Sequence, residues 1–182
     1  MVTVGRVILC LIIFTYAFMQ QNLTINLIGL AVHWVLDMAD GRLARAFKQE
    51  TVFGAQFDIL SDRLLVIFFL LNLILLKPVI LFPVVLYFAE FILLDTFLSI
   101  QFLNWGIISP NYFYKVDHKI WVLNWSPPAK FLNSSLVILL LLLTDLDWLP
   151  AFAAVLLIII KLFSIIRLQK IIQTRIHRSN DI

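Results

Sequence analysis

Long apolar runs separated by short polar breaks make up most of this chain. A helix needs roughly 20 mainly apolar residues to cross the hydrocarbon core of a bilayer. Six runs come close to that length, at residues 2–19, 23–44, 58–76, 79–102, 130–146 and 149–170. The pattern therefore predicts an all-α integral membrane protein, a bundle of about six transmembrane helices.

Composition agrees with this prediction and excludes a water-soluble protein. Of the 182 residues, 62% are hydrophobic and 14% are charged, and the mean hydropathy is +0.99, far above that of soluble domains. We expect a single membrane domain over residues 1–182, because no internal repeat or soluble segment is evident. The first run lacks a small-residue cleavage site, so we expect a retained anchor. Cys10 is the single cysteine, which excludes an intrachain disulfide.

The basic residues are divided unevenly between the two ends of the predicted spans. If the amino terminus is cytoplasmic, Lys77 is the only Lys or Arg in a connection on the opposite side, beside Asp145 and Asp147. Short connections rich in Lys and Arg stay on the cytoplasmic side of a membrane. Both termini, and the polar break around residues 48–54, are therefore predicted to be cytoplasmic.

Four aspartates flank this break at regular spacing. They lie in the frame D-x-x-D-G-x-x-A-R, eight residues, G-x-x-x-D-x-x-x-D, as Asp37, Asp40, Asp58 and Asp62. On helices, the first two lie roughly 60° apart on one face and the last two roughly 40° apart on the next helix. A short linker makes these helices antiparallel neighbours, so the two pairs can meet. Oxygen ligands of this kind suit magnesium or manganese, and the frame predicts a metal centre.

Each residue of the frame also has a simpler explanation. A lone acid at a membrane boundary is commonly a solvated helix end, but four acids together are costly there without a cation. Gly41 costs about 1 kcal/mol in a helix relative to alanine, which indicates close approach of a ligand to the backbone. Ala44 either keeps that face open or is ordinary packing, and Arg45 either clamps a phosphate or sets orientation. Gly54 is expected to end the linker in a conformation open to glycine.

The fixed positions of this frame resemble the signature of the CDP-alcohol phosphatidyltransferase family (CDP-alcohol phosphotransferases), whose members make phospholipid headgroups. The matching residues are Asp37, Asp40, Gly41, Ala44, Arg45, Gly54, Asp58 and Asp62. The resemblance implies a metal-dependent membrane enzyme. In it, a small alcohol would attack the phosphate nearest the lipid in CDP-diacylglycerol, and CMP would leave. It also implies a homodimer.

Roles for individual residues follow from the same resemblance. It implies that Asp37, Asp40 and Asp58 hold one or two magnesium or manganese ions at the diphosphate. Asp62 would act as the general base for the acceptor hydroxyl and would also contact the second ion. The cytidine diphosphate pocket would be lined by Gly41, Ala44 and Arg45.

The resemblance leaves the acceptor open between glycerol 3-phosphate and inositol or inositol phosphate. Family members that use glycerol 3-phosphate often carry D-P-L-A-D-K around the last two aspartates, whereas this chain has D-I-L-S-D-R over residues 58–63. This difference weakens the glycerol 3-phosphate assignment, and Arg63 is more similar to members that use inositol. The amino terminus also departs from the family, because little precedes Arg6, although Arg6 can still reach the cytoplasmic pocket.

Lys161 lies near the middle of the last run, where an unpaired ammonium costs roughly 2.5–3.5 kcal/mol. Glu90, at similar depth in the fourth run, is the expected partner in a structural ion pair. The alternative is that Lys161, with Arg167 and Arg63, binds a phosphate of the acceptor. His33 precedes Asp37 by one turn and either hydrogen-bonds it or is an ordinary buried histidine.

The connection at residues 103–129 mixes aromatic and basic side chains. This mixture is typical of a segment at the level of lipid headgroups, so we predict an interfacial helix near the mouth of the site. We expect membrane lipid as a partner and no nucleic acid. A metal or proton transporter could also place acids inside a bundle, but the acids here gather at the predicted cytoplasmic boundary. A catalytically inactive assembly subunit is a third alternative.

Overall fold

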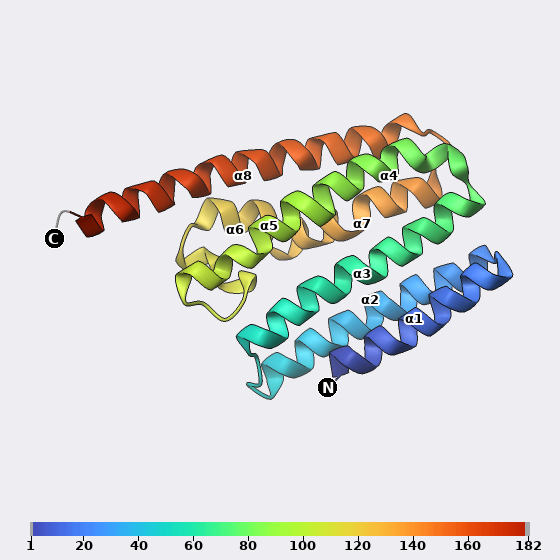
Figure 1. Cartoon of the computed structure of the whole chain (residues 1–182), viewed down its shortest axis with the longest axis horizontal. Coiled ribbons are helices and arrows are strands. Elements are labelled where there is room, and N and C mark those ends of the chain that lie inside the picture. Colours follow the sequence, from blue (N-terminus) through green and yellow to red (C-terminus); the bar gives the residue numbers. More distant parts are fainter. Residues whose placement is uncertain (1, 181–182) are drawn as a thin grey trace. The chain divides into compact units, whose positions relative to one another are not determined.

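The computed structural model describes residues 2–180, with side chains described for residues 3–175, and this part of the chain contains helices and no strand. Six helical stretches are long and apolar enough to cross a membrane: Thr3–Gln20, Leu23–Ala46, Val52–Leu76, Pro78–Trp105, His118–Leu143 and Trp148–Arg175. They can be followed along the colours of Figure 1. The prediction of an all-α membrane protein with six spans is confirmed.

Residue contacts group the chain into two compact parts, one ending at Val84 and the other beginning at Val85. The N-terminal part holds α1 (Val2–Gln20), α2 (Leu23–Ala46), α3 (Val52–Leu76), η1 (Pro78–Ile80) and the start of α4 (Leu81–Phe88). The C-terminal part continues with η2 (Ala89–Asp95), α5 (Thr96–Ile100), η3 (Gln101–Trp105), η4 (Pro110–Lys115), α6 (His118–Asn124), α7 (Pro127–Leu143) and α8 (Trp148–Asn180). The single domain over residues 1–182 stays a prediction.

Helices α1, α2 and α3 pack against one another in the N-terminal part (Figure 1). The connections between them are short, because a capping side chain starts the next helix a few residues after the previous one ends. The side chain of Asn22 accepts a hydrogen bond from the Ile25 N–H at 3.1 Å, and Thr51 accepts one from the Gly54 N–H at 3.0 Å. Such caps satisfy amide groups that have no partner within the helix. Consecutive helices are therefore antiparallel, and the start of α1 lies beside the connection between α2 and α3.

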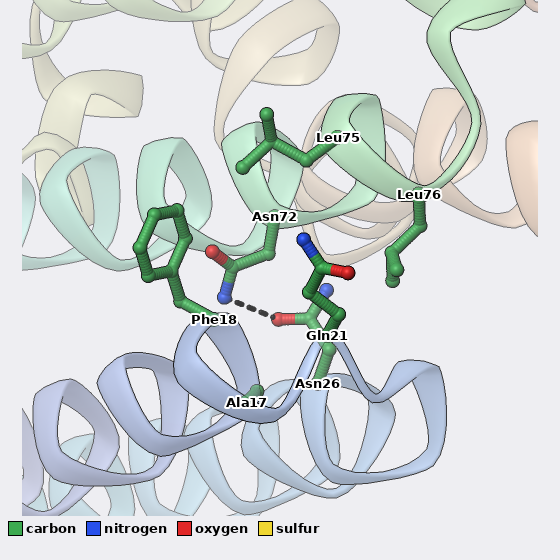
Figure 2. Close-up of a pocket in the computed structure, with 7 residues that line it drawn as sticks. All are labelled: Ala17, Phe18, Gln21, Asn26, Asn72, Leu75 and Leu76. Atoms are coloured by element: carbon green, nitrogen blue, oxygen red, sulfur yellow. Dashed lines mark hydrogen bonds between the residues drawn. The ribbon is translucent and has the colours of Figure 1, made fainter.

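Two buried amides tie the opposite end of these helices together (Figure 2). Asn72 of α3 donates to Asn26 of α2 at 3.0 Å and to the Phe14 carbonyl of α1 at 2.9 Å, while Asn26 donates to the Phe69 carbonyl at 3.0 Å. Gly29 permits close packing nearby, because a Cβ atom there would lie 2.6 Å from the Phe14 ring. Interhelical hydrogen bonds and small residues are the usual ties between membrane helices. They fix the register of α1, α2 and α3.

The C-terminal part is built around α8, which contacts α6, α7 and η2. Within it, η2 is a π-helix, and Glu90 and Asp95 lie near its two ends. In an α-helix, residues five apart would point about 140° away from each other. The wider π-turn places them on one face, toward α8.

Two helix boundaries differ from those predicted. The third span begins at Val52 rather than at residue 58, because the Thr51 cap starts a helix well before the apolar run does. The fifth span was predicted at 130–146 but comprises α6 and α7, with Pro127 at the first position of α7.

The expectation for Gly54 was wrong. Gly54 lies within the first turn of α3, and among the described residues Gly106 is the glycine with a positive φ. A Cβ atom at position 54 would lie 2.9 Å from the Thr51 hydroxyl oxygen. The glycine therefore makes room for the helix cap and does not end the linker in a special conformation.

The segment 103–129 forms the end of η3, then η4, α6 and the start of α7. Its aromatic side chains pack on one another, with Phe113 and Trp125 ring centroids 4.6 Å apart and Tyr114 and Trp121 5.7 Å apart. It is thus a set of short helices where one interfacial helix was predicted. Its location at the membrane surface stays a prediction.

Candidate metal centre

Three of the four aspartates converge at one point. Asp37 of α2 and Asp58 and Asp62 of α3 each offer one carboxylate oxygen, and these oxygens lie within 4.8 Å of one another. We call these residues the aspartate triad. All three side chains are partly exposed. The helical spacing of the acids and the short connection between α2 and α3 produce this arrangement, as the sequence predicted.

Arg6 of α1 pairs with every member of the aspartate triad. One guanidinium nitrogen donates to Asp37, and the other donates to Asp58 at 2.8 Å and to Asp62 at 3.0 Å. Arg6 itself is only 2% exposed. A buried guanidinium that bridges three carboxylates offsets part of their mutual repulsion.

Asp40 is not part of the triad. One oxygen of its carboxylate accepts a hydrogen bond from the hydroxyl of Thr3, one turn before Arg6 on α1. The first turns of α1 therefore contact all four aspartates. The role of Asp40 as a metal ligand stays a prediction.

Gly41 and Arg45 lie against each other on α2. A Cβ atom added to Gly41 would lie 3.3 Å from a terminal nitrogen of Arg45. The missing side chain thus makes room for the guanidinium of Arg45, which is exposed, one turn along the helix. Ala44 beside it is partly exposed. The guanidinium lies over the Gly41 backbone, so this face presents an exposed cation that can receive a phosphate.

Two further residues lie near the aspartates in sequence. Arg63 follows Asp62 on α3 and is half-buried. His33 is buried, and its Nδ1 atom has no hydrogen-bond partner among the described residues. The second interpretation of His33, an ordinary buried histidine, fits this observation better than a hydrogen bond from Nδ1 to Asp37.

Lys161 belongs to a buried cluster in the C-terminal part. Its ammonium lies 2.5 Å from Asp95, 3.0 Å from the Asn124 side-chain oxygen and 3.8 Å from Glu90. We call these four residues the lysine cluster. The predicted pairing with Glu90 is present, but Asp95 is the closer acid. The π-helix explains the difference, because α-helical spacing would have turned one of the two acids away.

The donor set of the aspartate triad fits a hard divalent cation. Magnesium and manganese prefer carboxylate oxygens, and three such groups converge here with partly exposed side chains. Arg6 supplies one positive charge against the three negative charges of the triad. The local charge therefore still favours a cation.

Comparison with known protein families decides what kind of protein this is. The CDP-alcohol phosphatidyltransferase family matches residues 1–167. The chain belongs to this family. No curated protein and no solved structure matches it. Family membership makes the chain a transferase of substituted phosphate groups that uses a CDP-alcohol in a membrane, and it favours this interpretation over a transporter.

Sequence reasoning underused the start of α1. It noted Arg6 only as a residue that can reach the pocket, and it gave Thr3 no contact. The sequence nevertheless indicated a partner for Arg6, because burying an unpaired arginine in an apolar span costs free energy unless acidic side chains pair with it. The pairing of Lys161 with Asp95 had no comparable signal, since a π-helix cannot be read from apolar periodicity.

Proposed function

We propose that this member of the family transfers a phosphatidyl group from CDP-diacylglycerol to a small alcohol and releases CMP. The observation that carries the proposal is the convergence of Asp37, Asp58 and Asp62 in a chain of this family. The acceptor oxygen forms a new bond to the phosphorus nearest the lipid. The bond from that phosphorus to CMP breaks, and the hydroxyl proton leaves with a base.

Asp62 is the proposed general base, and Asp37, Asp40 and Asp58 are the proposed ligands of one or two magnesium or manganese ions. A divalent ion held there would neutralise charge on the diphosphate and improve CMP as a leaving group. Asp62 needs only to come within hydrogen-bond reach of the acceptor hydroxyl. Its partly exposed carboxylate in the same cluster supports this role.

The nucleotide end of the substrate is assigned to the face of α2 that carries Gly41, Ala44 and Arg45. The exposed guanidinium of Arg45, for which Gly41 makes room, supports this assignment, because a guanidinium suits a phosphate. Arg63 is proposed to contact the acceptor or the diphosphate beside Asp62.

The acceptor is proposed to be inositol, its phosphate or glycerol 3-phosphate. The residues D-I-L-S-D-R at 58–63 favour an inositol compound. Lys161 as a contact for an acceptor phosphate stays a prediction, and its burial against Asp95 supports the structural alternative instead. We further propose a cytoplasmic site, cytoplasmic termini and a homodimer, for which the uneven distribution of Lys and Arg and the family resemblance are the support.

Released CMP tests this proposal directly. The purified protein is supplied with CDP-diacylglycerol, magnesium or manganese, and each of inositol, inositol phosphate, glycerol 3-phosphate and other small alcohols in turn. We expect CMP release that depends on one acceptor and that stops when the metal is chelated. Reactions without acceptor give the hydrolytic background. No acceptor-dependent CMP release across the panel would contradict the proposal.

A further inference from the structure

The guanidinium of Arg6 contacts the same carboxylates that are proposed to bind metal. It pairs with Asp37, Asp58 and Asp62, which come from two different helices. Its side chain is fully buried, whereas those of the three acids are partly exposed. Arg6 therefore approaches the aspartate triad from the inside of the helix bundle and leaves the outer side accessible.

The position of Arg6 is fixed by its surroundings on α1. Thr3, one turn earlier, holds Asp40 through its hydroxyl, and the amides Asn26 and Asn72 tie the other end of the same three helices. The guanidinium cannot leave the site by a shift of α1 without breaking these contacts. Its Nε atom is buried and has no hydrogen-bond partner, so the three aspartates are the polar groups that hold this side chain in the described part of the chain.

A guanidinium and a divalent ion both need carboxylate oxygens at close range. Each N–H donated to an oxygen engages a lone pair that the ion would use. The two cations also repel each other, and the repulsion is strong because the site is only partly open to water. Without either cation, three carboxylates within 4.8 Å would repel one another.

We propose that Arg6 is a built-in counter-cation that competes with the divalent metal for the aspartate triad. It holds α1, α2 and α3 together when no metal is bound, and metal binding requires it to give up contacts with the aspartates. Arg6 is thus a positioning residue that sets the metal affinity of the site. This inference rests on the proposed function in assigning the triad to a divalent metal.

Metal affinity of charge-altered variants tests the inference. Binding of Mn²⁺ alone, without CDP-lipid, is measured by its paramagnetic resonance signal for the wild type, Arg6→Gln, Arg6→Lys and Arg42→Met. Glutamine removes the charge but keeps a hydrogen-bonding group, and lysine keeps the charge. Arg42 is exposed on α2 and makes no contact with the triad among the described pairs, so its variant controls for the general loss of one positive charge.

Arg6→Gln should bind Mn²⁺ roughly tenfold more tightly than the wild type. Arg6→Lys should bind it more tightly than the wild type but less tightly than Arg6→Gln, and Arg42→Met should stay near the wild-type affinity. In chelator, Arg6→Gln should unfold at a lower temperature than the wild type, and Mn²⁺ should raise its unfolding temperature by more. A role limited to packing would lower stability equally with and without metal. Unchanged or weaker Mn²⁺ binding by Arg6→Gln overturns the inference.

Arg6→Lys decides the matter if Arg6→Gln does not fold. One ammonium cannot bridge three carboxylates as a guanidinium does, so this variant should be less stable than the wild type in chelator and regain that loss in Mn²⁺. Equal stability in chelator overturns the inference. CMP release is measured separately. If the variants show that Arg6 competes with Mn²⁺ for the triad but the wild type releases no CMP, the proposed function is refuted and the role of Arg6 stands.

Discussion

The aspartate triad and the lysine cluster both gather charged side chains inside apolar helices, yet they differ in exposure and in charge balance. The side chains of Asp37, Asp58 and Asp62 are 36%, 43% and 23% exposed, and one buried arginine serves all three. In the lysine cluster, Lys161, Glu90 and Asp95 are 1%, 0% and 5% exposed.

The lysine cluster is also tied into a network of neutral hydrogen-bonding groups. Asn124 accepts a hydrogen bond from Lys161 and donates at 2.8 Å to Ser164, whose own hydroxyl donates to the Ile160 carbonyl. Such a connected, buried set of polar groups joins α6, α8 and η2 and is typical of a structural role. Both clusters hold more acids than cations, but the excess negative charge of the triad lies on an accessible side. Burial alone is therefore weak support for a functional charge, whereas an accessible cluster with excess charge is the better candidate for a site.

The sharpest test of this contrast is Asp62→Asn. Loss of the proposed base should lower the rate of CMP release by about 10²- to 10⁴-fold, while binding of CDP-diacylglycerol stays largely intact. Turnover and equilibrium binding of the CDP-lipid are measured on the same preparation. Asp145→Asn, an exposed acid in the connection between α7 and α8, is the matched control. A near-normal rate in Asp62→Asn would remove this residue from the chemistry.

Lys161→Met should affect stability rather than metal binding. It leaves Glu90 and Asp95 buried without their lysine, and breaking a buried pair costs about 3–5 kcal/mol of unfolding free energy. Thermal unfolding in detergent measures the loss of stability, and Mn²⁺ titration checks that metal binding is unchanged. Lys170→Met, an exposed lysine on the same helix α8, is the control. An unchanged apparent acceptor affinity in folded Lys161→Met protein would rule out direct contact with the acceptor, whereas unaltered stability would contradict the structural role.

Asp37→Asn and Asp58→Asn should each weaken Mn²⁺ binding and CDP-lipid binding together. Loss of a group that merely orients a ligand already costs roughly 10- to 100-fold in metal affinity, so loss of a direct ligand should cost at least the lower figure. Titration with Mn²⁺ and then with CDP-lipid measures both. If neither variant changes the metal affinity, the ligand assignment is wrong.

The smallest expected effect concerns Asp117, which begins α6 and lies outside the spans. Burial tends to raise the pKa of its carboxyl, but hydrogen bonds from Arg167 and from the Ile120 N–H outweigh it and lower the pKa below the usual value. A lowered pKa means that the charged form stabilises the fold above the pKa of the unfolded chain, about 3.9, and that this contribution is lost as pH falls through the folded pKa.

Asp117→Asn should therefore lower the unfolding temperature slightly at pH 7, and the difference from wild type should shrink below about pH 4. Asparagine still caps a helix well, so the cap itself is retained. Unfolding curves of both proteins across this pH range provide the measurement. A difference that is independent of pH would show that the charge of Asp117 does not contribute.

The amino-acid sequence alone determined the class of fold and the main acids of the candidate metal centre. Apolar runs of spanning length allow only helices in a bilayer, since every backbone amide must be satisfied within the segment. The spacing of Asp37, Asp58 and Asp62, with a short connection between α2 and α3, brings these residues together by helical geometry alone. Local rules suffice for these features because they depend on residues near one another in the chain.

Only the tertiary structure decided which cation meets which acid. Arg6 is separated by 52 residues from Asp58, and Lys161 by 66 from Asp95, so their pairing depends on how α1 and α8 pack and not on any local pattern. The π-turn of η2 and the Thr51 cap that starts α3 early likewise shift side chains by amounts that apolar periodicity does not encode. A buried charge in an apolar bundle needs an opposite charge nearby, and the packing of the helices determines which of the available acids or cations lies close enough to pair with it.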